Sequence, residues 1–367
     1  MLAAALVVAA GLAVPAADAQ RGMLVGIQDD AMVLHGNPVF TFGMLRQLRV
    51  QIVRLNLNWP DVAKRRPAHP QDPADPAYDW DVYDRAVRYA AQNNIRLLLT
   101  FLFTPSWANG GKRRNVPPRN YNDLRNFAYA AATRYSGHYI PNTDDDNETY
   151  LPAVKYWLAW NEPNNPNWLQ QTSGGRFVSP RSYARICTAI WTGVHFTNFA
   201  GERVGCGATG PRGNNVARSR RPSMAPLVFM RAARKAGMRR LDAYAHHPYY
   251  GNPSESPATR GRGGTVLLGN IGTLIRQANK LFGKKPIWIT EYGFQTPPDR
   301  LFGISFARQA RYVAQAYAIG RRTPQIQMMV WFMLRDDTNR NIGWQSGLLT
   351  AKGRKKPAFN AFRRLPH

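Results

Sequence analysis

The stretch VKYWLAWNEP, residues 154–163, decides how the rest of the chain is interpreted. It begins as an apolar run rich in aromatic and β-branched residues, and the run ends at the polar residues that follow Trp160. Such a run is too short for a typical helix and long enough for a buried strand. Pro163 has no N–H to donate to a strand ladder, so the strand must end before it. The pattern predicts a buried strand that carries Glu162 at its carboxyl end.

A second stretch, PIWITEYG at residues 286–293, has the same design. Its apolar run ends at a glutamate, Glu291. In a barrel of parallel strands, the carboxyl ends of all strands meet at one mouth, where such barrels carry out their chemistry. We therefore expect Glu162 and Glu291 to face one mouth.

Strand patterns and helical patterns alternate along the whole chain. Strands are predicted over residues 23–28, 51–57, 95–103, 154–160, 203–209, 241–246, 287–290 and 326–334. Helices are predicted over residues 39–48, 81–92, 122–135, 180–198, 223–236, 265–282, 305–319 and 357–365. This alternation favours an α/β fold of the (β/α)8 TIM-barrel type. A length of 367 residues suits one such domain with insertions.

The two glutamate motifs resemble those of the clan A glycoside hydrolases, retaining (β/α)8 enzymes that include families 5 and 39. In those families an Asn-Glu-Pro after strand four carries the acid/base, and a glutamate after strand seven is the nucleophile. The resemblance covers most of the chain in strand order. It implies a retaining hydrolase that cleaves O-glycosidic bonds of a β-linked poly- or oligosaccharide by double displacement. Glu162 would be the acid/base and Glu291 the nucleophile.

The resemblance also implies residues that support the glutamate pair. Retaining hydrolysis needs two carboxyl groups about 5–5.5 Å apart, one of which stays ionised. Arg54 is the candidate that keeps Glu291 ionised, because an arginine on strand two contacts the nucleophile in these families. Asn161 is expected to hydrogen-bond the sugar 2-OH.

Further substrate-binding candidates follow strands six and eight. His247-Pro248-Tyr249 matches a His-x-Tyr of these families, so Tyr249 would donate to Glu291 and His247 would contact the sugar or the acid. His246 competes with His247, and spacing does not decide between them. Trp331 matches the tryptophan under the sugar. Aromatic residues in loops after strands are also candidates for stacking on sugars, and these are Trp59, Trp107, Trp168, Tyr292 and Trp344.

The charge of the chain is strongly positive, with 49 Lys and Arg against 22 Asp and Glu and a net charge of +27. The basic residues are scattered and form no nucleic-acid-binding motif, so no nucleic-acid partner is expected. The alternatives are an Arg-rich solvated surface and attraction to an anionic polysaccharide or cell envelope. No His-Glu-x-x-His motif and no Cys/His cluster occurs, so we expect neither a metal nor a cofactor.

The N-terminus and the cysteines bear on localisation. Residues 2–14 are apolar and Ala17-Asp18-Ala19 fits a cleavage site, which predicts a signal peptide at 1–19, a catalytic domain at 20–367 and a secreted, extracellular or periplasmic protein. No Lys or Arg precedes the apolar core, which is unusual for such a leader. No internal segment is long and apolar enough to span a membrane. Cys187 and Cys206 permit a disulfide, with two buried free thiols as the alternative.

A second function from another class fits the same pattern. The chain could be a catalytically silent carbohydrate-binding barrel that serves at the cell envelope, guided by its charge. The presence of both Glu162 and Glu291 favours the enzyme. We expect the protein to act as a monomer.

Overall fold

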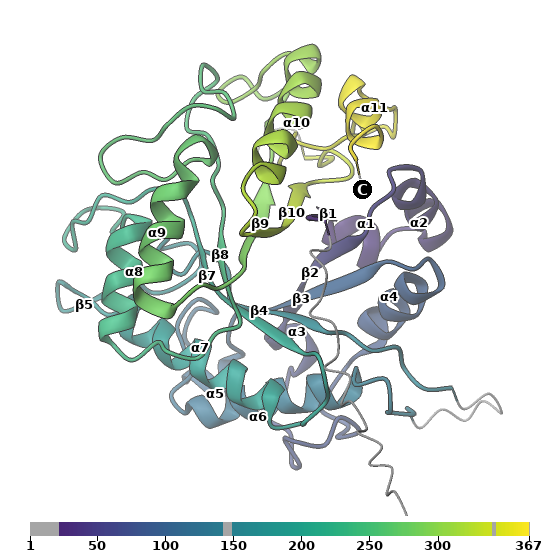
Figure 1. Ribbon diagram of the computed structural model, residues 1–367. Coiled ribbons are helices and arrows are strands. Elements are labelled where there is room, and N and C mark those ends of the chain that lie inside the picture. The colour runs from purple at the N-terminus through teal and green to yellow at the C-terminus, as the bar shows by residue number, and fades with distance from the viewer. Residues whose placement is uncertain (1–21, 142–148, 340–342, 367) are drawn as a thin grey trace, which may run out of the picture.

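A closed barrel of eight parallel strands forms the centre of the protein (Figure 1). The computed structural model describes residues 22–141, 149–339 and 343–366. The strands of the barrel are β1 (Leu24–Gln28), β2 (Ile52–Asn58), β3 (Arg96–Leu102), β4 (Tyr156–Ala159), β7 (Arg203–Thr209), β8 (Ala243–His246), β9 (Ile287–Tyr292) and β10 (Ile326–Phe332). Their order around the barrel follows the chain, and β10 closes it against β1. The predicted (β/α)8 fold is therefore confirmed.

Helices surround the barrel, as Figure 1 shows. The long ones are α2 (Pro38–Gln47), α4 (Asp81–Gln92), α6 (Tyr121–Arg134), α7 (Ser179–His195), α8 (Pro226–Lys235), α9 (Ile271–Phe282), α10 (Phe306–Arg321) and α11 (Pro357–Arg363). Each overlaps a helix predicted from the sequence. The sequence did not predict the short elements in the loops, which are α1 (Asp30–Leu34), α3 (Trp59–Val62), α5 (Ser106–Asn109), η1 (Leu268–Asn270) and the hairpin of β5 (Thr172–Ser173) and β6 (Arg176–Phe177).

The interior of the barrel is a packed layer of apolar side chains rather than a channel. Its fully buried members are Ile52, Leu98, Leu158, Ala208, Ala243, Ala245, Trp288 and Met328. Gly205 makes room for the largest of them, because a Cβ there would lie 2.5 Å from the ring of Trp288. This layer closes the barrel below the mouth, so polar side chains at the strand ends rest on a rigid floor.

A disulfide links the helix layer to the barrel. Cys187 of α7 is bonded to Cys206 of β7, with their Cα atoms 6.1 Å apart. Of the two states that the sequence left open, the structure has the disulfide.

The predicted signal peptide lies outside the described residues. Among residues 22–141, 149–339 and 343–366, we find no helix with the length and apolar character needed to cross a membrane.

Candidate active site

A cavity of about 690 Å³ lies at the carboxyl ends of the strands, and both Glu162 and Glu291 line it. Its other described lining residues come mainly from the ends of β1, β4, β8, β9 and β10 and the loops that follow. They include Gln28, Asp29, Asp30, Asn56, Asn165, Trp168, Gly210, Arg212, Tyr249, Tyr250, Gln295, Phe302, Phe332, Met333, Asp337 and Trp344. The mouth of the barrel therefore contains the expected glutamate pair.

Glu162 is held in a tightly constrained backbone after β4. Trp160 has a φ of 70° and Glu162 a φ of 33°, and such left-handed conformations cost about 1–3 kcal/mol each in non-glycine residues. Hydrogen bonds to neighbouring strands hold them, from Trp160 N to Phe101 O (3.0 Å) and from Glu162 N to Ala208 O (2.9 Å). A Cβ at Gly210 would lie 3.1 Å from the carboxyl group, so a side chain at this position would crowd Glu162.

The carboxyl group of Glu162 has polar contacts on both oxygens. Asn165 Nδ2 donates to Oε2 at 2.8 Å, and His247 Nδ1 lies 3.2 Å from Oε1. The side chain is 12% exposed, so it remains open to the cavity. No guanidinium or ammonium group forms an ion pair with Glu162 among the described residues.

Glu291 at the end of β9 has a different environment. Arg54 Nη1 donates to Oε1 at 2.5 Å, and the Tyr249 hydroxyl donates to Oε2 at 3.2 Å. Burial alone would raise the pKa of Glu291, but the positive charges of His247 and Arg54 and the hydrogen bonds from Arg54 and Tyr249 together lower it below its usual value. Glu291 is therefore the glutamate that stays ionised.

Arg54 is fully buried behind Glu291 and is held by several acceptors. Besides Glu291, these are Thr100 Oγ1 (2.9 Å from Nε), Gln28 Oε1 and Thr290 O (2.8 and 3.1 Å from Nη1), and Asn161 Oδ1 (2.7 Å from Nη2). It contacts the predicted nucleophile and the predicted 2-OH ligand rather than facing the cavity. Arg54 thus orients Glu291 and Asn161 together.

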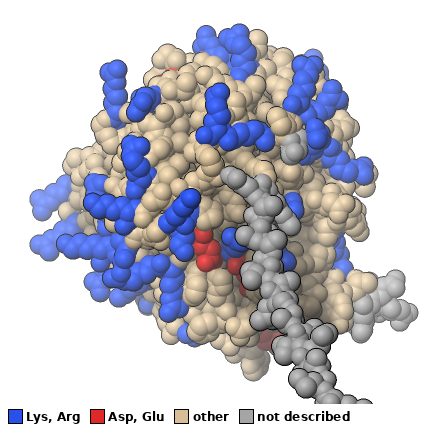
Figure 2. Space-filling model, viewed as in Figure 1, with Lys and Arg blue, Asp and Glu red and all other residues tan. Residues whose placement is uncertain are grey.

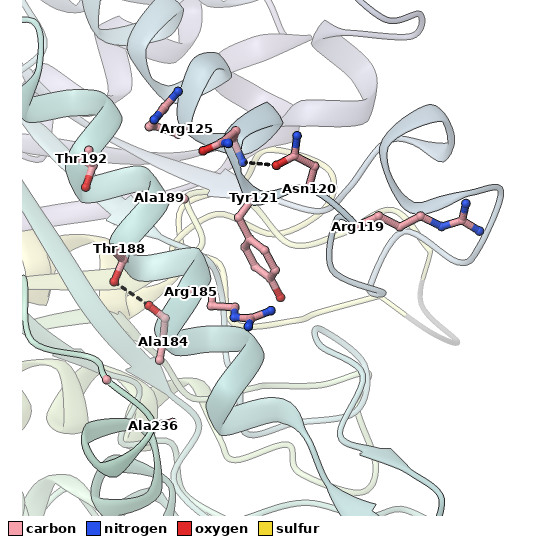
Figure 3. A pocket seen from close by; sticks show the side chains of 12 residues that line it. Arg119, Asn120, Tyr121, Arg125, Ala184, Arg185, Thr188, Ala189, Thr192 and Ala236 are labelled. Atoms are coloured by element: carbon pink, nitrogen blue, oxygen red, sulfur yellow. Dashed lines mark hydrogen bonds between the residues drawn. The ribbon is translucent and has the colours of Figure 1, made fainter.

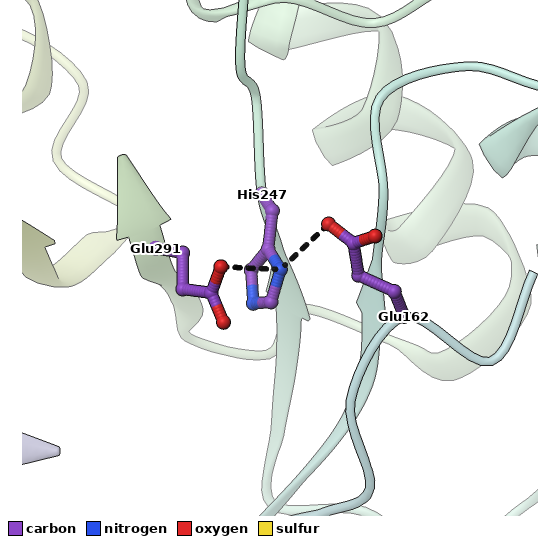
Figure 4. A group of neighbouring side chains, drawn as sticks. All are labelled: Glu162, His247 and Glu291. Atoms are coloured by element: carbon purple, nitrogen blue, oxygen red, sulfur yellow. Dashed lines mark hydrogen bonds and ion pairs between the residues drawn. The ribbon is translucent and has the colours of Figure 1, made fainter. Parts of the chain in front are cut away.

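His247 lies between the two glutamates (Figure 4). Its Nδ1 is 3.2 Å from Glu162 Oε1 and 3.7 Å from Glu291 Oε2, while Nε2 lies 2.8 Å from the hydroxyl of Thr290. One ligand atom from each of Glu162, His247 and Glu291 lies within 4.8 Å of the other two. One carboxyl oxygen of Glu162 is therefore within 4.8 Å of one of Glu291, a short approach of the kind that retaining glycosidases need, since their carboxyl groups lie about 5–5.5 Å apart.

The same three residues are close enough to hold a metal ion. However, Arg54 already places a positive charge 2.5 Å from Glu291, and both oxygens of that carboxylate accept hydrogen bonds. A divalent cation here would be repelled by the guanidinium at short range. The set suits an acid and a nucleophile better than a metal centre.

His246, the competing histidine, lies outside this cluster. Its Nδ1 accepts from the Thr209 hydroxyl (2.9 Å), while Nε2 donates to the carbonyl of Val266 (3.0 Å). Burial lowers the pKa of His246 to about 3, so the ring is neutral. Of the two histidines, the structure places His247 at the site.

Two of the tryptophans predicted to bind the substrate, Trp331 and Trp107, do not line the cavity. Trp331 is fully buried behind the cavity wall, where Nε1 donates to Ser346 O at 2.9 Å. The next residues, Phe332 and Met333, line the cavity instead. This differs from the predicted place of Trp331 under the sugar, because Trp331 points toward the helix layer.

Trp107 of α5 is also set back from the cavity. Its Nε1 donates to Ala63 O at 2.8 Å, its ring packs edge-on against Trp59, and the Arg66 guanidinium lies 4.6 Å from its centre. Trp59 and Tyr292 are buried. Of the loop aromatics named from the sequence, Trp168 and Trp344 line the cavity.

Several cavity residues were not singled out from the sequence, among them Asn165, Arg212, Tyr250, Phe332 and Asp337. The only signal in the sequence is their position shortly after predicted strands. Tyr250 could have been found in this way, since it directly follows the His-x-Tyr motif.

Asp29 and Asp30, which follow β1 and begin α1, form an acidic corner of the cavity. Asp29 accepts from the N–H groups of Met32 and Arg335, both at 3.0 Å. Asp30 accepts from Asn56 through its backbone N–H (3.1 Å) and its side-chain amide (2.7 Å). Burial raises the pKa of each aspartate to about 6.

A second cavity, of about 600 Å³, lies in the helix layer between α6 and α7 (Figure 3). Arg119, Arg125 and Arg185 line it together with Tyr121. None of its described lining residues has a carboxylate, so it lacks the groups for acid/base or nucleophilic hydrolysis.

Part of the chain is similar in sequence to a known family of glycoside hydrolases. Residues 228–362 match the family model described as the glycosyl hydrolase catalytic core. This segment contains His247 and Glu291 but not Glu162. No curated protein sequence matches the chain.

Solved structures with the same fold include three glycosidases. A family 39 glycoside hydrolase from Bacteroides cellulosilyticus WH2 has 20% identity and a TM-score of 0.65 and aligns over 94% of this chain and 63% of its own. A glucosidase from Croceicoccus marinus has 15% identity and a TM-score of 0.67, with coverages of 94% and 65%. A monomeric β-xylosidase from Caulobacter crescentus CB15 has 16% identity and a TM-score of 0.63, with coverages of 94% and 69%.

The chain therefore spans less than two thirds of the length of the first two of these proteins. At such identities the similarity shows the fold. The catalytic-core match supports a glycosidase, and the solved structures confirm the barrel fold that the resemblance to clan A glycoside hydrolases implied.

Proposed function

We propose that the protein is a retaining glycoside hydrolase that acts on a β-linked poly- or oligosaccharide. The observation that carries this proposal is the unequal glutamate pair. Glu162 and Glu291 contribute atoms within 4.8 Å of each other at the barrel mouth, and only Glu291 contacts a guanidinium. Double displacement needs such a pair, with one carboxylate ionised and one carboxyl able to exchange its proton.

In the first step, an oxygen of the Glu291 carboxylate attacks the anomeric carbon. The bond from that carbon to the glycosidic oxygen breaks, and the departing oxygen takes the proton of Glu162. The products are an alcohol and a glycosyl ester of Glu291.

In the second step, water attacks the anomeric carbon and displaces the Glu291 carboxylate. The proton of the water returns to Glu162, which restores both groups. Two inversions at the same carbon give net retention of configuration.

The neighbouring residues serve these two steps. Arg54 and Tyr249 contact the two oxygens of Glu291 and hold the attacking carboxylate in place. Asn161, fixed through its amide oxygen by Arg54, is positioned to donate from its amide nitrogen to the sugar 2-OH. His247 contacts both glutamates and fixes their positions relative to each other.

A panel of aryl β-glycosides and β-linked polysaccharides tests the proposal. We expect turnover on at least one of them, and proton NMR of the first-formed sugar should show the β anomer. Glu291→Gln should remove turnover. Glu202→Gln is the matched control, because Glu202 is also a buried glutamate but hydrogen-bonds Trp157 and Thr197 away from the cavity. An α anomer as the first product would contradict double displacement.

The alternative is the silent carbohydrate-binding barrel. Sugar binding needs hydrogen-bonding groups and aromatic rings, but it does not require a buried carboxylate held ionised beside a second carboxyl group. The Arg54–Glu291 pair therefore favours the enzyme. Carbohydrate binding without turnover across the whole panel would favour the alternative.

We further propose that the protein is exported and acts at or near an anionic envelope. The disulfide supports this, because disulfides persist in oxidising compartments. A cavity of about 710 Å³ at the opposite end of the barrel adds support, since Arg96, Arg203, Lys284, Lys285 and Arg321 line it without an accompanying carboxylate among the described lining residues. We expect the protein to bind anionic vesicles at low salt and to be released from them at high salt.

A further inference from the structure

The charge of the cavity is opposite to that of the molecule as a whole. The chain carries a net charge of +27, and Lys and Arg side chains are spread over the left and upper parts of the face shown in Figure 2. The catalytic cavity, in contrast, is lined by five carboxylates, those of Asp29, Asp30, Glu162, Glu291 and Asp337. Arg212 is the single Arg or Lys among its described lining residues. An anionic polymer drawn to the exterior would therefore meet an acidic cavity.

The acidic side of the cavity is the side of the nucleophile. Asp30 lies close enough to Glu291 for the two negative charges to interact, and Asn56 fixes its carboxylate through two hydrogen bonds. Arg54 lies nearby but is fully buried, and each of its three nitrogens already donates to a protein acceptor. It is thus not available to bind a carboxylate on the substrate.

The single cationic residue lies on the side of the acid/base. Arg212 interacts with the charge of Glu162, and its Nη1 donates to Tyr250 O at 3.1 Å. Its side chain is 41% exposed, and Nη2 lies 3.7 Å from Glu255 Oε2. A guanidinium that is partly exposed in this way has room for another acceptor.

The roles of the two glutamates show which part of the substrate lies on the Arg212 side of the cavity and which lies on the Asp30 side. Glu162 protonates the leaving oxygen, so the leaving group lies on the side of Arg212. Glu291 bonds to the anomeric carbon, so the sugar that it captures lies on the side of Asp30. A negative charge on that sugar would face a fixed carboxylate, and no described residue that lines this side of the cavity supplies a cation to offset it.

We propose that Asp30 makes the captured sugar position selective for neutral or amino sugars and excludes a uronosyl unit there. This inference rests on the proposed hydrolase function. The Asp30 carboxylate can accept hydrogen bonds from sugar hydroxyls or from an ammonium group, but it repels a sugar carboxylate. Asp30 is accordingly a specificity residue that contacts the substrate.

Matched substrate pairs test the proposal. Aryl β-glycosides of glucose, galactose and mannose are compared with the uronides that differ only by a carboxylate at C6. For the best neutral sugar, we expect the wild-type kcat/KM to exceed that of its uronide at least a hundredfold. In Asp30→Asn this ratio should fall at least tenfold, which corresponds to about 1.4 kcal/mol. Asp81→Asn, an exposed residue of α4, removes the same charge away from the cavity and should leave the ratio unchanged.

The pH dependence of the wild-type ratio gives a second measurement that needs no variant. The groups around Asp30 are Asp29, which caps α1, Arg54 and Asn56 on β2, Tyr83 on α4 and Glu291 on β9, with Arg335 beyond Asp29. The pKa of Asp30 is raised to about 6, whereas a sugar carboxyl ionises at about pH 3–4. The exclusion of the uronide should therefore weaken as the pH falls through 6. Titration of the catalytic groups affects both substrates and cancels in the ratio.

The outcomes separate the inference from the function. If the wild type hydrolyses a uronide better than its neutral partner, the inference is overturned. It also fails if Asp30→Asn retains turnover of the neutral glycoside but keeps the wild-type ratio. If Asp30→Asn does not fold, a wild-type ratio that stays constant as the pH falls through 6 overturns the inference. Hydrolysis of neither substrate by the wild type would instead contradict the hydrolase function itself.

Discussion

Replacing Arg54 with methionine should expose how much Glu291 depends on its buried cation. Arg54 Nη1 lies 2.5 Å from Glu291 Oε1, and the two side chains are 0% and 11% exposed. Removing one partner of a buried ion pair typically costs about 3–5 kcal/mol, because the other charge is left buried and unpaired. We therefore expect Arg54→Met to lose roughly that much free energy of unfolding at pH 7, where Glu291 is ionised.

The sign of the pH dependence follows from the pKa of Glu291. In the wild type this pKa lies below its usual value, so the pair stabilises the protein above that usual value and the stabilisation is lost as the pH falls through the lowered pKa. In the variant, Arg54 no longer offsets the effect of burial on the carboxyl group, so the pKa of Glu291 rises. The stability difference between wild type and variant should thus shrink at acidic pH, and the acid limb of kcat/KM should move to higher pH.

Urea unfolding at pH 7 and pH 5, together with the pH profile of kcat/KM, measures both effects. Arg134→Met is the matched control, because Arg134 forms a similarly buried pair with Asp84, with side chains 9% and 18% exposed, outside the cavity lining. It should lose stability without a shift of the acid limb. If the acid limb of Arg54→Met stays in place, or shifts equally in Arg134→Met, Arg54 does not control the ionisation of Glu291.

Four further changes test other parts of the site and fold. Glu291→Gly should lose turnover, and azide entering the vacated space should give a glycosyl azide of inverted configuration by NMR; a retained azide would place the nucleophile elsewhere. Glu162→Ala should lose far more activity on substrates with poor leaving groups than on activated aryl glycosides, whereas equal losses would exclude the acid/base role. Tyr249→Phe removes the hydroxyl 3.2 Å from Glu291, so kcat should fall about 10–100-fold, the equivalent of the roughly 1.5–3 kcal/mol of a hydrogen bond to a charged group; an unchanged kcat would show that this bond is dispensable. Reducing the Cys187–Cys206 disulfide, which spans 19 residues, should lower the urea midpoint by the equivalent of about 3 kcal/mol, with a Cys-to-Ser double variant insensitive to reductant as the control.

The sequence predicted the barrel because each strand and helix has a strong local pattern. The ends of two predicted strands also placed Glu162 and Glu291 at the mouth. Spacing did not separate His246 from His247, since both follow the same strand. In the structure, Ala243 and Ala245 face the barrel interior, and alternation along the strand then places His247 on the inner side. Choosing between His246 and His247 therefore required knowing which face of the strand points into the barrel, and residue types alone do not determine this.

The same alternation explains why Trp331 is not at the cavity. The register pairs Phe332 with Gln28, and Gln28 in turn with Arg54, so these three side chains form one inward-facing row. Trp331 pairs with Ile27 in the adjacent, outward-facing row. A one-residue offset exchanges the two faces of a strand. Matching by residue type selected the tryptophan, whereas the register selects its neighbour.

Glu291 would face outward as well if β9 were regular. Met329 pairs with Ile289 and Trp331 pairs with Tyr292, so β9 has one more residue than β10 over this interval. Such a bulge redirects side chains, and bulges are frequent beside active sites. Without it, strict alternation would put Glu291 in the row of Ile289, which packs toward the helices. The extra residue turns the carboxylate into the mouth to meet Arg54, a step that the apolar run before Glu291 could not reveal.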